Sequence, residues 1–203
     1  PRMAGRVPTI LNLRDAWLLS GHCAFSFECD RWRHGCGRCP DLALYPPVRR
    51  DATAYNWRRK REILAQCRLY VTTPSQWLMD RVHASLLAPA IIEGRVIPNG
   101  VDTSDFSPGD KAAARAELGI AAGARVLMFA ANGIRNNAWK DYRALLAAIR
   151  IIGAAGAAAN VILLAVGETA PPEQVGAATI RFVPFQGEAA TLARYYRAAD
   201  VYV

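Results

Sequence analysis

The feature that most constrains this chain is a turn-rich segment in its middle, Val-Ile-Pro-Asn-Gly-Val-Asp-Thr-Ser-Asp-Phe-Ser-Pro, which runs from Val96 to Pro108. Residues 99–108 are rich in Gly, Pro, Asp and Ser, which favour turns and interrupt regular elements. On each side of this segment, strand patterns alternate with helix patterns, and such alternation predicts parallel sheets flanked by helices. We therefore expect two α/β units, 1–98 and 109–203, joined by a hinge at 99–108.

Composition narrows the class of protein without choosing its function. The 203 residues are 52% hydrophobic and 21% charged, which suits one sizeable core or two modest ones. A net charge of +8 fits an anionic partner, which could be a nucleotide diphosphate, an acidic membrane surface or nucleic acid. No apolar run is long enough for a transmembrane helix, and the first residues lack the apolar core of a signal peptide. We expect a cytoplasmic protein with reduced thiols.

In the first half, we expect strands at 7–13, 68–72 and 95–98 and helices at 51–66 and 76–85, with Trp77, Leu78 and Val82 on the inward face of the second helix. Arg14 and Asp15 follow the first strand, and ligands of open α/β sheets bind at the carboxyl ends of strands. These two residues are therefore candidates for a catalytic site. For Asp15, a helix cap is the structural alternative.

Four cysteines lie in the insert 21–50, which is too long and too rich in Gly and Pro for a simple connection: Cys23, Cys29, Cys36 and Cys39. Thiolates in such a cluster could hold a structural zinc ion, with His22 and His34 as spare ligands. A zinc ribbon normally has two tight C-x-x-C pairs, however, and this segment has one. Buried reduced thiols or a disulfide therefore remain alternatives. Cys67 stands apart, and we expect it in the core.

In the second half, we expect strands at 125–131, 161–166 and 180–183, with helices at 111–118, after Lys140 and near the chain's end. The turn Asn132-Gly133-Ile134-Arg135-Asn136-Asn137-Ala138-Trp139-Lys140 joins a strand to a helix. Such turns present backbone N–H groups at the positive end of a helix dipole, and Gly133 would allow a close backbone approach. Arg135 and Lys140 add charge suited to a diphosphate. The alternative is that both are solvated loop residues.

A basic cluster, Arg58 to Arg61, lies close to Tyr55 and Trp57. Its simplest interpretation is a solvated helix face. The alternative is a contact with the anionic inner leaflet of a membrane, which would make the protein peripheral on the inner membrane.

Four segments, taken in order, resemble glycosyltransferases of family 4, which have the GT-B fold: 71–78, 96–102, 129–140 and 195–203. The stretches Asp-Ala-Trp-Leu-Leu-Ser-Gly-His-Cys, Gly-Cys-Gly-Arg-Cys-Pro-Asp-Leu and Thr-Ala-Tyr-Asn-Trp resemble the exopolysaccharide, O-antigen and colanic-acid type of that family. The resemblance implies two Rossmann-like domains. This chain would contain the later part of the first, acceptor-binding domain and the early part of the second, donor-binding domain.

The resemblance also implies an activity: retaining transfer of a sugar from a UDP- or GDP-sugar to a saccharide or lipid-linked acceptor in bacterial surface-polysaccharide synthesis, with no cofactor required. Lys140 matches the family's phosphate-binding lysine, and Arg135 has a suitable spacing for its arginine. Other residues fall near the family's base and ribose contacts: Gly167, Glu168 and Phe185. Where the subgroup often has His before the acidic residue, this chain has Arg14, which cannot act as a general acid or base near neutral pH.

The family's Glu-x7-Glu motif would lie beyond Val203, so we expect this fragment to be inactive alone. The sequence is also compatible with two other functions. The cysteines with their basic and aromatic neighbours could form a zinc-knuckle module that binds nucleic acid. Alternatively, the chain could be a GT-B-like epimerase or a nucleotide-sugar binder without transferase activity. The hinge and the two α/β patterns favour the transferase, and no nucleic-acid partner is expected.

Overall fold

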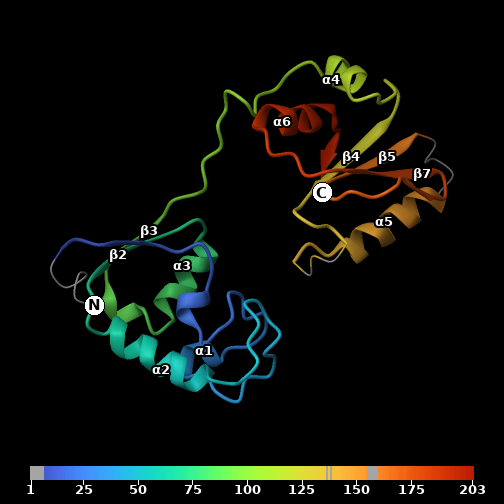
Figure 1. Cartoon of the computed structure of the whole chain (residues 1–203). Coiled ribbons are helices and arrows are strands. Elements are labelled where there is room, and N and C mark those ends of the chain that lie inside the picture. The colour runs from blue at the N-terminus through green and yellow to red at the C-terminus, as the bar shows by residue number, and fades with distance from the viewer. Residues whose placement is uncertain (1–6, 136, 138, 155–159) are drawn as a thin grey trace. The chain divides into compact units, whose positions relative to one another are not determined.

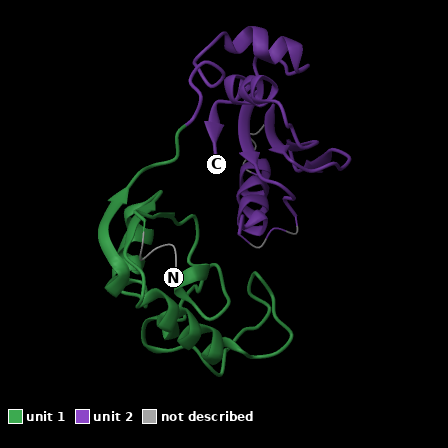
Figure 2. Cartoon of the chain, turned by 60° about the vertical axis from the view of Figure 1, so that its left-hand side comes forward, with its two compact units in different colours: residues 1–100 green, residues 101–203 purple. Residues whose placement is uncertain are grey.

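A computed structural model describes residues 7–135, 137, 139–154 and 160–203. The chain divides into two compact units, residues 1–100 and 101–203 (Figure 2). The division falls within the segment 99–108 in which we expected a hinge. Asn136 and Ala138 of the predicted anion-binding turn lie outside the described residues.

The first unit is built on a three-stranded parallel sheet in the order β1-β2-β3, formed by Ile10–Asn12, Leu69–Thr73 and Ile91–Val96. Its main helices are α2 (Thr53–Leu64) and α3 (Gln76–His83). Shorter helical turns lie between these elements: η1 (Trp17–Leu19), α1 (Arg31–His34) and η2 (Ala88–Ala90). The insert 21–50 therefore contains only α1 as regular structure.

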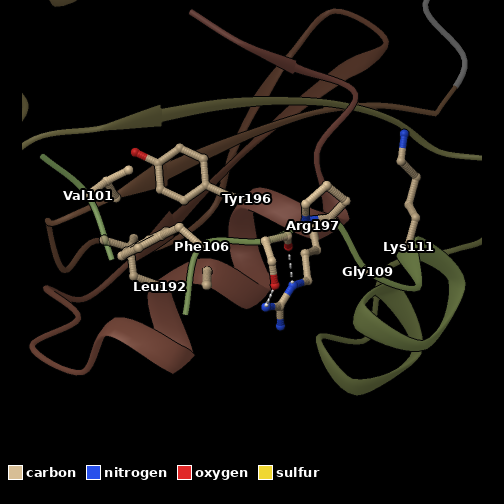
Figure 3. Close-up of a pocket in the computed structure, with 10 residues that line it drawn as sticks. Val101, Phe106, Gly109, Lys111, Leu192, Tyr196 and Arg197 are labelled. Atoms are coloured by element: carbon tan, nitrogen blue, oxygen red, sulfur yellow. Dashed lines mark hydrogen bonds between the residues drawn. The ribbon is translucent and has the colours of Figure 1, made fainter. Parts of the chain in front are cut away.

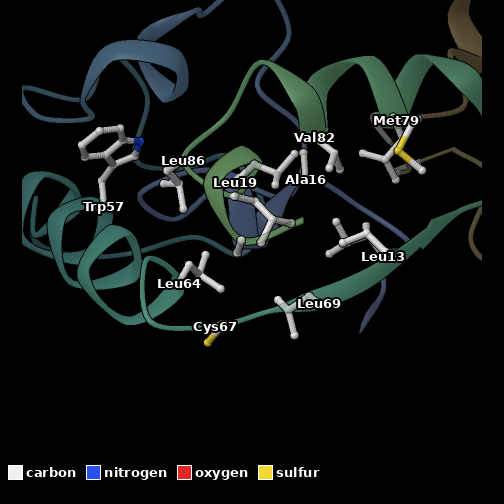
Figure 4. Packing of buried hydrophobic residues seen from close by; sticks show 14 residues of the cluster. Leu13, Ala16, Leu19, Trp57, Leu64, Cys67, Leu69, Met79, Val82 and Leu86 are labelled. Atoms are coloured by element: carbon white, nitrogen blue, oxygen red, sulfur yellow. The ribbon is translucent and has the colours of Figure 1, made fainter. Parts of the chain in front are cut away.

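The core of the first unit lies on one face of this sheet (Figure 4). Alternate residues of β2 point inward, so that Leu69 and Val71 are buried while Tyr70 lies on the open face. Trp57 and Leu64 of α2 pack into the same core, as does Cys67, whose predicted burial is confirmed. Core formation therefore fixes α2 against the strands.

Helix α3 begins where the sequence predicts, because the Ser75 hydroxyl accepts a hydrogen bond from the Leu78 N–H at 3.4 Å. Leu78 and Val82 are buried as expected. The prediction for Trp77 was wrong. Its side chain is 45% exposed and stacks on Phe25, with ring centroids 5.2 Å apart. The irregular insert supplies this partner, which helical periodicity alone cannot reveal.

Strand β3 starts four residues earlier than expected and ends at Val96, two residues before the predicted end. Gly94 lies within this strand, where glycine usually weakens pairing. Here the missing side chain makes room for α3, because a Cβ on Gly94 would come within 2.9 Å of the Met79 sulfur and 3.3 Å of His83 Nε2. The glycine therefore serves helix packing.

The second unit contains a five-stranded sheet in the order β6-β7-β5-β4-β8 (Figure 1). Four strands are parallel: β4 (Arg125–Ala130), β5 (Val161–Val166), β7 (Ala178–Val183) and β8 (Val201–Tyr202). Strand β6 (Glu173–Val175) runs antiparallel to β7 at one edge, and the sequence analysis missed it. Gly176, at φ +61°, lies in the tight turn between these two strands.

Helices cover both faces of this second sheet. Helix α5 (Tyr142–Ala154) packs through Tyr142 and Ile149 on one face. The opposite face packs against α4 (Lys111–Glu117) and α6 (Ala189–Ala198). Strand β5 is an uninterrupted apolar run, and this composition allows helices to pack on both faces of the sheet. Both units thus confirm the predicted α/β class with parallel sheets.

Asp200 ties the end of α6 to α4 and to the sheet. Its carboxylate accepts hydrogen bonds from the Arg115 guanidinium at 2.7 Å, the Lys111 ammonium at 2.8 Å and the Val126 N–H at 2.8 Å. Burial alone would raise the pKa of Asp200, but these three donors lower it to about 2. Among the described helices, none is both long and apolar enough to cross a bilayer.

Candidate functional site

Of the predicted donor-binding residues, Phe185 follows β7, whereas Gly133, Arg135, Gly167 and Glu168 meet at the carboxyl ends of β4 and β5. Because these strands are parallel neighbours, with Ala130 paired to Val166, the chain leaves both at the same edge of the sheet. Gly133 has a φ of +68°, and its N–H donates a hydrogen bond to the Gly167 carbonyl at 3.2 Å. The loop after β4 is therefore joined directly to the end of β5. This edge is where open α/β sheets bind ligands.

A hollow of about 180 Å³ opens at this edge. Gly167 and Phe185 line it, together with Asn132, Gln186 and apolar residues of the sheet and α6. The Phe185 side chain is 67% exposed, so an aromatic face is available beside backbone groups. Such a hollow can accept a flat ring by stacking and hydrogen-bond its polar edge.

Glu168 lies next to this hollow and binds the loop that precedes α5. One oxygen of its carboxylate accepts hydrogen bonds from the backbone N–H groups of Ile134 and Arg135, each at 2.8 Å, and the other accepts from Arg135 Nε at 2.6 Å. The Arg135 N–H and the other two donors outweigh burial and lower the pKa of Glu168. The backbone N–H groups of Ile134 and Arg135, which were expected to bind a phosphate, therefore bind an internal carboxylate instead.

Lys140 is exposed and forms no ion pair among the described residues. It lies two residues before α5, and its backbone N–H donates to the Asn137 carbonyl at 3.1 Å. The first turn of α5 is capped by Asp141, whose carboxylate accepts the Ala144 N–H at 3.2 Å. The Lys140 ammonium is thus available to an anion, while one amide of the helix start is already satisfied.

At the end of β1, Arg14 and Asp15 are both exposed and do not pair with each other in the described part of the chain. An Asp15 oxygen accepts the Trp17 N–H at 2.8 Å, which turns the chain into η1. The N-cap of η1 is Ala16, without a side-chain cap, so Asp15 makes a turn contact and is not the helix cap that the sequence offered as an alternative. Its second carboxylate oxygen and the Arg14 guanidinium remain open to solvent and ligands.

Lys60 is a residue of this region that the sequence analysis placed in a solvated cluster. Its ammonium lies 3.6 Å from the centre of the Trp17 ring and donates to the carbonyls of Trp17 and Ser20 at 2.6 and 2.9 Å. Burial lowers its pKa to about 8. The spacing from Trp57 to Lys60 is a helical i,i+3 pair, which was the available signal that Lys60 could share the inward side of α2.

The four cysteines of the insert come together with His22 around one small cavity of about 20 Å³. His22 Nε2 lies 3.4 Å from the Cys39 sulfur, while its Nδ1 faces the Pro46 carbonyl at 3.2 Å. The Cys36 sulfur accepts the Gly21 N–H at 3.2 Å. Burial raises the pKa of the Cys23 thiol, and that of Cys36 to about 11, so these thiols are protonated at neutral pH.

All five cysteines are unpaired in this structure. Within the described ranges, no three or more His, Cys, Asp or Glu side chains are arranged so that they could hold a metal ion. His34, the second spare ligand named from the sequence, is not among the residues around the cavity. The thiols are therefore gathered in one place without forming a ready coordination site.

Asp51 connects the insert to α2. Its two carboxylate oxygens accept hydrogen bonds from the Cys39 N–H at 2.8 Å, the Thr53 N–H at 2.9 Å and the Thr53 hydroxyl at 2.6 Å. The Thr53 hydroxyl and these backbone N–H groups lower the pKa of Asp51 to about 2. Helix α2 begins at Thr53, two residues after the predicted start, and Asp51 instead anchors the cysteine segment to it.

A larger hollow of about 580 Å³ lies elsewhere in the second unit, between α6 and residues 101–111 (Figure 3). Phe106, Leu192 and Tyr196 form much of its wall. Arg197 holds this part of the chain in place, since its guanidinium donates to the carbonyls of Asp105 and Ser107 at 2.7 and 3.0 Å. None of the predicted site residues lines this hollow.

Comparison with known proteins assigns a class to the chain, although no family model matches it. It is 35% identical over 101 residues to a putative colanic acid biosynthesis glycosyl transferase, WcaC, of Escherichia coli K12, an alignment that covers 47% of this chain and 24% of the relative. It is also similar to D-inositol 3-phosphate glycosyltransferases of Actinosynnema mirum and Segniliparus rotundus, at 36% and 40% identity over 118 residues. These alignments cover 52% of this chain and 28% and 25% of the relatives.

The chain thus spans about a quarter of the length of the curated relatives that it matches. The names of these relatives agree with the resemblance found in the four ordered segments, and the parallel sheets agree with the fold which that resemblance implies. The chain is related to glycosyltransferases, and its two α/β units are those of a partial GT-B, Rossmann-like fold.

Proposed function

We propose that this chain is part of a retaining glycosyltransferase of family 4 that moves a sugar from a UDP- or GDP-sugar to a saccharide or lipid-linked acceptor. The observation that carries the proposal is the hollow at the carboxyl ends of β4 and β5; the exposed Lys140 follows β4 in sequence, at the start of α5. A nucleoside would enter this hollow, with its base against Phe185 and its ribose near Gly167. The relative named for colanic acid biosynthesis supports a role in bacterial surface-polysaccharide synthesis.

Lys140 is the group that we propose for stabilising the leaving diphosphate. When the bond between sugar and phosphate breaks, negative charge builds on the β-phosphate, and a fixed positive charge lowers the energy of that state. The Lys140 ammonium is not neutralised by any described carboxylate, so its full charge is available. We therefore propose a transfer that requires no metal cofactor.

For the acceptor side, we propose Arg14 and Asp15 at the end of β1. The free oxygen of Asp15 could accept a hydrogen bond from an acceptor hydroxyl, and Arg14 could contact a phosphate of a lipid-linked acceptor. Lys60 lies behind this edge and holds the turn Trp17–Ser20 through two carbonyls. Its role would be to keep the strand end in shape.

We also propose a cytoplasmic location with peripheral contact to the inner membrane. Three cations of α2 remain on its exposed side after Lys60 turns inward: Arg58, Arg59 and Arg61. Each exposed cation near an anionic surface contributes about 1 kcal/mol. Binding to vesicles that contain phosphatidylserine, compared with vesicles of phosphatidylcholine alone, tests this contact. Equal binding to both kinds of vesicle would contradict it.

The donor assignment is tested by titrating the chain with UDP, GDP, uridine, guanosine and inorganic pyrophosphate in a calorimeter. We expect one of the two nucleoside diphosphates to bind more tightly than its nucleoside, because the diphosphate adds the contact with Lys140. The natural full-length protein is then assayed for transfer from the matching nucleotide sugar. If neither diphosphate binds and no nucleotide sugar is consumed, the proposed function is wrong.

A further inference from the structure

The ion pair between Arg135 and Glu168 shapes the loop that leads to Lys140. Three donors from two consecutive residues converge on one carboxylate, and this carboxylate belongs to the end of β5. The Glu168 side chain is only 20% exposed. These hydrogen bonds hold the loop after β4 against the end of the neighbouring strand, directly beside the hollow.

The Arg135 guanidinium is held on its other sides as well. Its Nη1 lies 3.6 Å from a Glu173 oxygen, and its Cζ lies 4.8 Å from the centre of the Phe182 ring. Two carboxylates therefore balance a single positive charge. With its Nε held by Glu168, Arg135 could meet a donor phosphate only through its Nη groups, next to two carboxylates that would repel the diphosphate.

Lys140 differs from Arg135 in this respect. Both residues flank the same loop, yet the described carboxylates leave the Lys140 ammonium unpaired. An incoming diphosphate can meet this charge without breaking an internal ion pair. The two cations that the family resemblance treats alike are thus in different electrostatic states.

Resting on the proposed donor site, we propose that Arg135 is a positioning residue that acts through Glu168, and that Lys140 alone of the two contacts the diphosphate. The Arg135–Glu168 pair fixes the loop and at the same time neutralises a carboxylate that would otherwise oppose donor binding. Loss of Arg135 therefore harms binding in two ways, and one of these is reversed by removing the charge of Glu168.

This reasoning predicts a rescue that direct phosphate contact does not. In Arg135→Gln, the Glu168 charge is exposed to the donor, and we expect affinity for the nucleoside diphosphate to fall about tenfold. In the double variant Arg135→Gln/Glu168→Gln, the repelling charge is gone, and affinity should return to within about threefold of the wild type. Lys140→Gln should lose about tenfold.

The experiment measures the affinity of UDP and GDP and the ligand-free melting temperature for the wild type and each variant. Arg135→Gln and Glu168→Gln should each lower the melting temperature, and their effects should be less than additive because both break one pair. Lys140→Gln should leave it unchanged. Arg194→Gln is the matched control. The Arg194 guanidinium forms an exposed ion pair with Glu117, with 2.9 Å between the paired atoms, and neither residue lines the hollow.

Two outcomes overturn the inference. One is a double variant that binds no better than Arg135→Gln, because Arg135 would then contact the phosphate itself. The other is additive changes in melting temperature, because the two residues would then not act as a pair. Failure of the proposed function is distinct: the wild type would bind neither diphosphate, and the ligand-free temperatures would still decide whether the pair acts as a unit.

Discussion

Replacing Gly167 by Ala tests how strictly the edge that carries the hollow depends on close backbone packing. Gly167 has φ +116°, and a Cβ at this position would lie 1.8 Å from the Ala131 carbonyl oxygen. Restoring a separation of 3.0 Å would require that oxygen to move by about 1.2 Å. This shift strains the Ala131-to-Val166 and Gly133-to-Gly167 backbone hydrogen bonds, which are 3.0 and 3.2 Å long.

The cost of this substitution combines two effects. An unfavourable φ for an alanine costs about 1–3 kcal/mol. Each backbone hydrogen bond that is lost costs about 1 kcal/mol more. We therefore expect Gly167→Ala to lower the free energy of unfolding of the second unit by about 4 kcal/mol. Gly133→Ala is the control, since Gly133 also has a positive φ but its added Cβ would meet no atom within 4 Å. It should cost about 1 kcal/mol.

Native-state hydrogen exchange of the β4 and β5 amides measures this difference without requiring both units to unfold together. The β2 amides of the first unit provide an internal reference that neither substitution should change. Equal losses of protection in the two variants would refute the reasoning, because the contact with Ala131 would then contribute nothing.

Two further substitutions test the rest of the chain. Because the folded-state pKa of Asp200 lies below its ordinary value of 3.8, its contribution to stability is present above about pH 4 and is lost as the pH falls toward 2. With the side chain 38% exposed, we expect Asp200→Asn to cost about 1 kcal/mol at pH 7 and less at pH 3, as urea titrations at both pH values would show; a difference that does not shrink at pH 3 contradicts this. For the cysteines, we propose a structural zinc ion, so that protein purified without a histidine tag carries about one zinc per chain and Cys36→Ser/Cys39→Ser carries none. Because one zinc ion would join cysteines that no disulfide links, chelation should also lower the melting temperature, whereas a metal content well below one per chain excludes the site.

The elements that could be predicted from the sequence are those whose own residues determine them. Strand β5 is apolar throughout and was expected at its observed bounds, and α5, which carries a helical stripe of apolar residues, was expected to begin after Lys140 and begins at Tyr142. The bounds of strand β3 were predicted wrongly because Gly94 weakens the strand signal. The glycine is required there because Met79 and His83 of helix α3 pack against it. Short-range patterns contain no information about such a neighbour.

The same distinction explains the candidate site. The loop 132–140 could be found from the sequence, because a glycine, two cations and a strand-to-helix junction all lie within nine residues. The partner of Arg135 could not, since Glu168 is 33 residues away and reaches it only because β4 and β5 are paired in register.

Counting the cations in a sequence therefore overestimates the positive charge available to an anion whenever the fold pairs one of them with an internal carboxylate. In this loop two cations were counted, but the structure leaves only Lys140 of that pair without a described acidic partner. A sequence-based argument for phosphate binding should accordingly ask which acidic residues follow the neighbouring parallel strand, because their side chains emerge at the same sheet edge. Glu168 satisfies that condition directly after β5, so the strand order, once known, was sufficient to suspect the pair.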